Sequence, residues 1–99
     1  MQRILPASMI KLLPKWVKRD LQKRIDSVNW VWPQHDIRVD IHSEQDLRKA
    51  MTHPGYGYVD GSDLTPGDKF PYLGWLWTGR DGRRVLAVMR ISEVRRLRS

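Results

Sequence analysis

Hydrophobic and polar positions near the start of the chain repeat with the period of a helix. In residues 15–28 the apolar positions follow one another at intervals of four, four and three: Val17, Leu21, Ile25 and Val28. This spacing puts them on one side of a helix, while most of the lysines and arginines fall away from that side. We therefore expect a basic helical segment over 8–28 that opens with a short turn capped by Ser8. Trp16 borders the apolar side and is expected to be half buried.

Strict alternation follows in residues 28–42 and predicts a hairpin with its turn at 33–36. One face of that hairpin carries Trp30, Trp32, Ile37, Val39 and Ile41. The other face is mostly polar and carries Arg38, Asp40 and His42. A half-buried hairpin of this kind makes Trp30 and Trp32 core residues.

A second helix is expected over residues 43–52. Ser43 is a suitable N-cap, acidic residues fill the first turn, and the spacing of Leu47, Ala50 and Met51 makes a buried edge. The following segment, 53–71, is rich in Pro and Gly and predicts a long loop, with at most a short edge strand at Tyr58–Val59.

A second hairpin over residues 72–91 is the best-defined unit. The dipeptide Asp81-Gly82 is typical of a two-residue type I′ turn, which places Arg80 opposite Arg83. In this register one face carries Trp75 and Trp77 together with Arg84 and Arg90. Both faces are largely apolar, so we expect this hairpin to be central in the sheet or covered on both sides. Ser92 then caps a short basic helix in residues 92–99.

The order helix, hairpin, helix, long loop, hairpin, short helix predicts an α+β fold with about four mainly antiparallel strands and helices packed on the sheet. A chain of 99 residues builds one hydrophobic core, so residues 1–99 are expected to form a single domain. The absence of cysteine excludes a disulfide framework and thiolate metal sites, and it suits the cytoplasm. The apolar runs are too interrupted to span a membrane.

Charge is distributed unevenly along the chain, which carries a net +7. Residues 1–29 hold seven Lys or Arg against two Asp or Glu, residues 30–68 hold three against seven, and residues 69–99 hold eight against two. Basic ends around an acidic middle favour acidic partners, either nucleic acid (DNA or RNA) or an acidic protein surface.

Two sets of residues are candidates for nucleic-acid binding. The cations that would contact phosphate are Lys11, Lys15, Lys18, Arg19, Lys23, Arg80, Arg83, Arg84, Arg90, Arg95 and Arg96. The aromatic residues that would contact bases, or a pocket on a protein partner, are Tyr56, Tyr58, Trp75 and Trp77. Nucleic-acid backbone binding is the leading functional hypothesis.

Two alternatives remain open. One is a non-enzymatic protein-interaction inhibitor of the phage or mobile-element type. The other is a small metal-independent ribonuclease of the toxin type, with Arg38, Asp40, His42 and His53 as its catalytic residues. Enzyme activity is the less favoured hypothesis. No cofactor or metal is expected, because no recognised ligand spacing is present. A homodimer is expected only if no helix covers the face with Leu73, Trp75 and Trp77.

Overall fold

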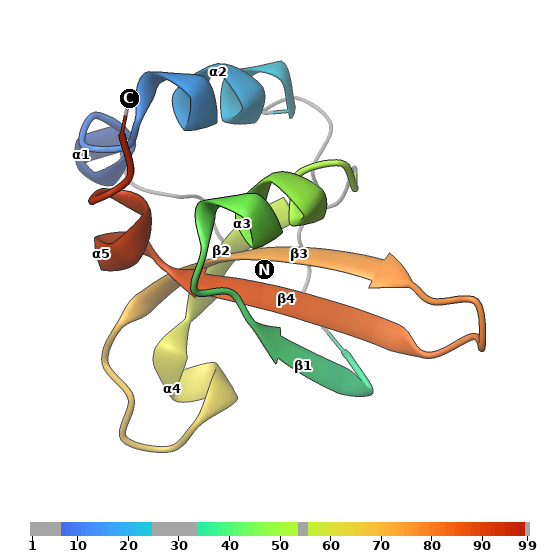
Figure 1. Cartoon of the computed structure of the whole chain (residues 1–99). Coiled ribbons are helices and arrows are strands. Elements are labelled where there is room, and N and C mark those ends of the chain that lie inside the picture. The colour runs from blue at the N-terminus through green and yellow to red at the C-terminus, as the bar shows by residue number, and fades with distance from the viewer. Residues whose placement is uncertain (1–6, 25–33, 54–55, 99) are drawn as a thin grey trace.

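The computed structural model describes residues 7–24, 34–53 and 56–98, which form an α+β fold around one mixed sheet (Figure 1). Its elements are α1 (Ala7–Ile10), α2 (Lys15–Arg24), β1 (Ile37–Asp40), α3 (Glu44–Ala50), β2 (Tyr56–Asp60), α4 (Gly61–Leu64), β3 (Pro71–Thr78), β4 (Arg84–Arg90) and α5 (Ile91–Val94). The strand order is β1-β4-β3-β2, in which β1 runs parallel to β4 and the other pairs are antiparallel. The predicted α+β class with four mainly antiparallel strands is confirmed.

The second hairpin forms the two central strands, as expected from its two apolar faces. Alternate residues of β3 and β4 point to opposite sides of the sheet. Figure 1 shows α1, α2 and α3 on one side and α4 on the other. The main core lies under the helices and includes Val17, Leu47, Leu73, Trp75 and Met89. Since helices of the same chain cover the Leu73/Trp75/Trp77 face, the condition for a homodimer through it is not met.

The turn between β3 and β4 differs from the predicted type I′ turn. The Gly79 amide donates to Arg83 O at 2.7 Å and the Gly82 amide donates to Gly79 O at 3.1 Å. Gly82 has φ of +82°, whereas no described non-glycine residue has positive φ. A type I′ turn would require positive φ at Asp81 as well. The loop is therefore a three-residue connection, a type I turn followed by a glycine in the left-handed region.

The longer turn shifts the register of β3 against β4 by one residue. Trp75 pairs with Ala87 rather than with Val88. A shift of one residue moves every side chain of one strand to the other face relative to its neighbour. Arg84 and Arg90 therefore lie on the face opposite Trp75, and the predicted aromatic–basic surface on this hairpin is wrong. Arg80 lies in the turn and does not oppose Arg83.

The predicted loop 53–71 is more ordered than its composition indicated. The edge strand is five residues long, Tyr56–Asp60, and pairs antiparallel with β3. The helical turn α4 follows directly, and the Asp60 carboxylate caps it by accepting from the Ser62 amide at 3.0 Å. Burial of Val59 against the sheet holds the strand in place, which the count of Pro and Gly does not reveal.

Predictions for the helix ends were partly correct. The Ser43 hydroxyl accepts from the Asp46 amide at 3.1 Å, so its role as N-cap is confirmed. Ser8 and Ser92 were wrongly predicted as caps, because α1 and α5 begin before them and include them. The pair Trp30 and Trp32 lies outside the described residues.

The predicted core face of β1 is only partly buried. Ile41 is buried, whereas Val39 is 43% exposed. The reason is that β1 lies at the edge of the sheet, next to β4 alone among the described strands.

Candidate functional site

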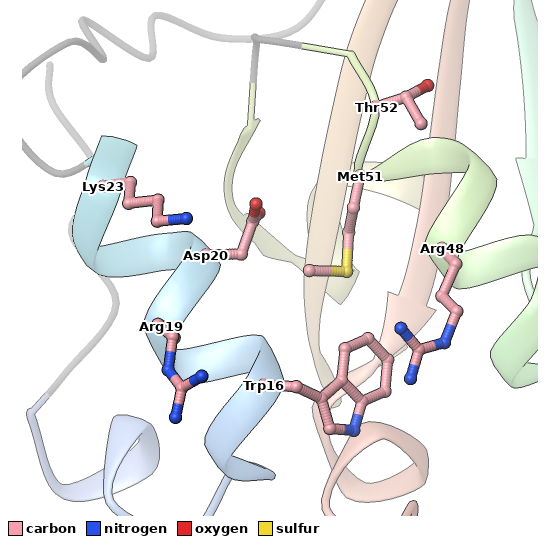
Figure 2. A pocket seen from close by; sticks show the side chains of 7 residues that line it. All are labelled: Trp16, Arg19, Asp20, Lys23, Arg48, Met51 and Thr52. Atoms are coloured by element: carbon pink, nitrogen blue, oxygen red, sulfur yellow. The ribbon is translucent and has the colours of Figure 1, made fainter.

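A groove of about 310 Å³ lies between α2 and α3 (Figure 2). Val17 and Leu21 of α2 are buried in the core, so the neighbouring side of this helix faces the groove. That side contributes Trp16, Arg19, Asp20 and Lys23, and the opposite wall contributes Arg48, Met51 and Thr52. The four α2 positions are separated by three, one and three residues, which is the spacing of one helix face.

Trp16 is held in a fixed orientation at one end of this groove. Its indole Nε1 donates to Arg98 O at 2.7 Å, although 82 residues separate the two. The guanidinium carbon of Arg48 lies 4.1 Å from the centroid of the indole ring, a favourable cation–π distance. The hydrogen bond ties the C-terminal segment to α2, so the two basic ends of the chain meet here.

Positive charge is concentrated along α2. Lys15, Arg19 and Lys23 are exposed and recur every four residues, so they form one row along the helix. Within the described residues, their side chains make no hydrogen bond or ion pair. Lys11, Arg95 and Arg96 are exposed as well, and Lys18 is half-buried. The groove lining itself carries three cations and one carboxylate.

The hairpin tip does not join this surface. Arg80 and Arg83 are exposed in the turn between β3 and β4, and Arg84 is exposed at the start of β4. This turn is at the end of the sheet away from α1 and α5 (Figure 1). Arg83 Nε lies 3.5 Å from Asp81 Oδ2, which offsets part of the charge at the tip. The structure therefore separates the cations of the tip from those of α2 and the C-terminal segment.

The predicted aromatic contacts are mostly packed on the core. Trp75 is fully buried, which excludes it as a contact residue. Tyr56 and Tyr58 are half-buried against the main core, and the Tyr56 hydroxyl donates to Leu21 O at 3.3 Å. Trp77 is half-buried and stacks on His53, with ring centroids 4.0 Å apart and planes at 6°.

Three of the four predicted catalytic residues line one cavity of about 390 Å³ on the other side of the sheet: Arg38, Asp40 and His42. However, Asp40 Oδ1 pairs with Arg38 Nη2 at 2.9 Å, while His42 Nδ1 lies 3.6 Å from Glu93 Oε2. The predicted second acid–base group, His53, stacks on Trp77 on the helix-covered side of the sheet. The structure thus brings Arg38, Asp40 and His42 to one cavity and places His53 on the other side of the sheet.

Arg90 also lines this cavity, and it is engaged in a polar network. Its Nε donates to the Tyr72 hydroxyl at 3.3 Å, and that hydroxyl donates to Asp68 Oδ2 at 2.8 Å. Hydrogen bonds from the Phe70 amide and Tyr72, followed by the charges of Arg90 and Arg38, hold the pKa of Asp68 below its usual value. The Tyr72 hydroxyl raises the pKa of Arg90. Arg90 thus belongs to a hydrogen-bonded network on the other side of the sheet and is not part of the groove between α2 and α3.

Trp16 and Arg48, which make the cation–π contact in the groove, are among the lining residues that are missing from the predicted binding residues. Trp16 borders the apolar side of α2 as expected, and its separation from Arg19 and Lys23 by three and seven residues was the available signal. Arg48 carried no such signal, because only the packing of α3 beside α2 brings it to the indole.

Within the described ranges, no group of His, Asp or Glu side chains is arranged to hold a metal ion. None of the helices in these ranges is long and apolar enough to cross a bilayer. Comparison with known protein families, with curated proteins and with solved structures finds no match to this chain.

Proposed function

We propose that the protein binds the phosphate backbone of nucleic acid along α2 and the adjoining C-terminal segment. The observation that carries the proposal is the hydrogen bond from Trp16 Nε1 to Arg98 O, because it brings the two basic ends of the chain together. Cations gathered in this way raise the local positive potential and attract a polyanion.

The row of Lys15, Arg19 and Lys23 fits a phosphate backbone. At 1.5 Å rise per residue, these three positions extend over about 12 Å of helix, enough to follow several phosphates. Since the side chains are not engaged within the described part of the chain, a phosphate does not have to displace an internal partner. Contacts of this kind supply affinity through counterion release and carry no base specificity.

The test compares two triple variants that remove the same charge. Lys15→Gln/Arg19→Gln/Lys23→Gln changes the row on α2, and Arg80→Gln/Arg83→Gln/Arg84→Gln changes the hairpin tip. Fluorescence anisotropy with labelled oligonucleotides should show that the α2 variant loses affinity by about 10²-fold at ~0.1 M salt. Its plot of log affinity against log salt should be shallower by about two to three units. The tip variant should stay within about threefold of wild type.

Two outcomes contradict the proposal. If the wild-type protein binds neither DNA nor RNA at ~50 mM salt, backbone binding is wrong. If both triple variants lose affinity equally, net charge rather than the α2 surface drives binding. A protein partner that is captured stoichiometrically after nuclease treatment, without nucleic-acid binding, is the result expected for a protein-interaction inhibitor.

A further inference from the structure

We infer that the bound nucleic acid is single-stranded and that one unpaired base enters the groove between α2 and α3 to stack on the Trp16–Arg48 pair. This inference rests on the proposed backbone binding and adds the class of nucleic acid and the residues that select it. The shared requirement is an unpaired base next to a phosphate, which single-stranded DNA and RNA both supply.

The base and the phosphate are expected to bind at different places on this surface. Figure 2 shows Trp16, Asp20 and Lys23 reaching from α2 toward α3, with Met51 and Arg48 directed back toward them. The indole ring and the Met51 side chain make apolar walls, which suit a base. The Asp20 carboxylate is the one negative group among the described lining residues, and it lowers the attraction of the interior for a phosphate. Phosphates are therefore favoured along the exposed row of Lys15, Arg19 and Lys23.

Arg48 supplies a flat surface for stacking. Its guanidinium lies over the Trp16 ring at 4.1 Å, and its side chain is 57% exposed. Its ion pair with Glu44, at 3.7 Å on the surface of α3, is of the weak exposed kind. Bases stack both on aromatic rings and on arginine guanidinium planes. A base can therefore lie against the guanidinium, or replace it on the indole, at little cost.

Trp16 makes the platform rigid before a ligand arrives. The hydrogen bond from its Nε1 to Arg98 O fixes the orientation of the ring. A surface that is already ordered loses less conformational entropy on binding. In a duplex the bases are paired and stacked inside the helix, so no base reaches a groove between two protein helices unless it leaves the stack. The geometry thus favours single strands over duplexes.

The test uses the full chain and labelled oligonucleotides of about 12 residues, within the usual site size for single-strand binding. Four probes are compared by anisotropy: single-stranded DNA, single-stranded RNA, single-stranded DNA containing abasic residues, and duplex DNA. We expect the single strands with bases to bind about tenfold more tightly than the abasic strand, because base stacking is lost in the latter.

The matched variants are Arg48→Lys and Arg83→Lys. Both keep the charge, but only the first removes a guanidinium from the groove. Arg48→Lys should weaken binding of the single strands by about tenfold and leave the salt slope unchanged, whereas Arg83→Lys should have no effect. Trp16→Leu should act like Arg48→Lys, with circular dichroism as the check on folding. Since Arg48 is exposed, its variant reports on binding even if Trp16→Leu fails to fold.

The results separate this inference from the proposed function. If no probe binds, both are wrong. If single-stranded, abasic and duplex probes bind equally and Arg48→Lys behaves as wild type, backbone binding stands and the stacking site is wrong. Tighter binding of single-stranded RNA than of single-stranded DNA, or the reverse, supports the inference, since both strands carry unpaired bases.

Discussion

Tryptophan has different surroundings in two regions of the molecule, at the centre of the sheet around Trp75 and in the groove around Trp16. Trp75 is fully buried beneath the helices, and its indole Nε1 has no hydrogen-bond acceptor among the described residues. Trp16 is half-buried, donates its N–H to Arg98 O and carries Arg48 on its ring. A tryptophan can therefore belong to the proposed binding surface only when the fold leaves its ring accessible.

Arginines show the same contrast. On the outer face of the sheet, Arg38 pairs with Asp40 and also donates to Thr65 Oγ1 at 3.1 Å, while Arg90 bonds Tyr72 and lies 4.5 Å over the Phe70 ring. On α2, Arg19 makes no such contact within the described residues. Net charge thus overstates the positive charge that is available to a partner, because part of it is already paired inside the fold.

The largest expected effect is the difference in folding stability between substitutions of the two tryptophans. Trp75→Ala should lower the free energy of unfolding by about 3–5 kcal/mol, because it removes a large side chain from a packed core. Trp16→Ala should cost less than about 2 kcal/mol, since its ring is partly in solvent. Urea denaturation measures both. If Trp75→Ala does not fold, Trp75→Phe serves in its place, and equal losses at the two sites would remove the contrast.

A smaller effect tests the turn that sets the sheet register. Gly82→Ala should cost about 1–2 kcal/mol, because an L-residue is strained at φ of +82°. An added Cβ would meet nothing within 4 Å, so the loss comes from the backbone alone. Gly82→Asn is the matched control and should lose less, since Asn tolerates the left-handed region better. Equal stability of all three proteins would mean that the turn is not the one described.

The smallest effect concerns the acid stability of the outer face. The pKa of Asp68 is lower in the folded protein than its usual value of 3.8. Its contribution to folding stability is therefore present above pH 3.8 and is lost as the pH falls through the folded pKa. The difference in melting temperature between wild type and Asp68→Asn should be constant above about pH 5 and shrink toward pH 3. Arg19→Gln, on the groove, should show no such pH dependence. A constant difference at every pH would contradict the network around Asp68.

Local features could be predicted where neighbours in the sequence decide the structure. The spacing of Val17 and Leu21 predicted which side of α2 is buried, and Ser43 predicted the start of α3. The two apolar faces of the second hairpin predicted its central position. The register was wrong because Asp81-Gly82 suits both a two-residue loop and a three-residue loop ending in glycine.

The candidate site was also predicted only in part, because periodicity along the chain does not reveal contacts between residues far apart in sequence. Lys15, Arg19 and Lys23 could be assigned to one basic surface because helical periodicity places them together. Arg38, Asp40 and His42 were placed on one side of the sheet by their alternation and line one cavity there. Their pairing was not predictable, because Glu93 comes from α5 and reaches His42 only after the chain has folded.

The sequence by itself determined the α+β class, the basic side of α2 and the position of Trp16 at its border, since each depends on the period of residues close along the chain. Tertiary structure alone decided that Arg48 covers the Trp16 ring and that the C-terminal segment holds its N–H. It also decided that Arg90 and Trp75 face opposite sides of the sheet. These contacts join residues far apart in sequence, and strand register and helix packing, which fix them, depend on the whole core at once.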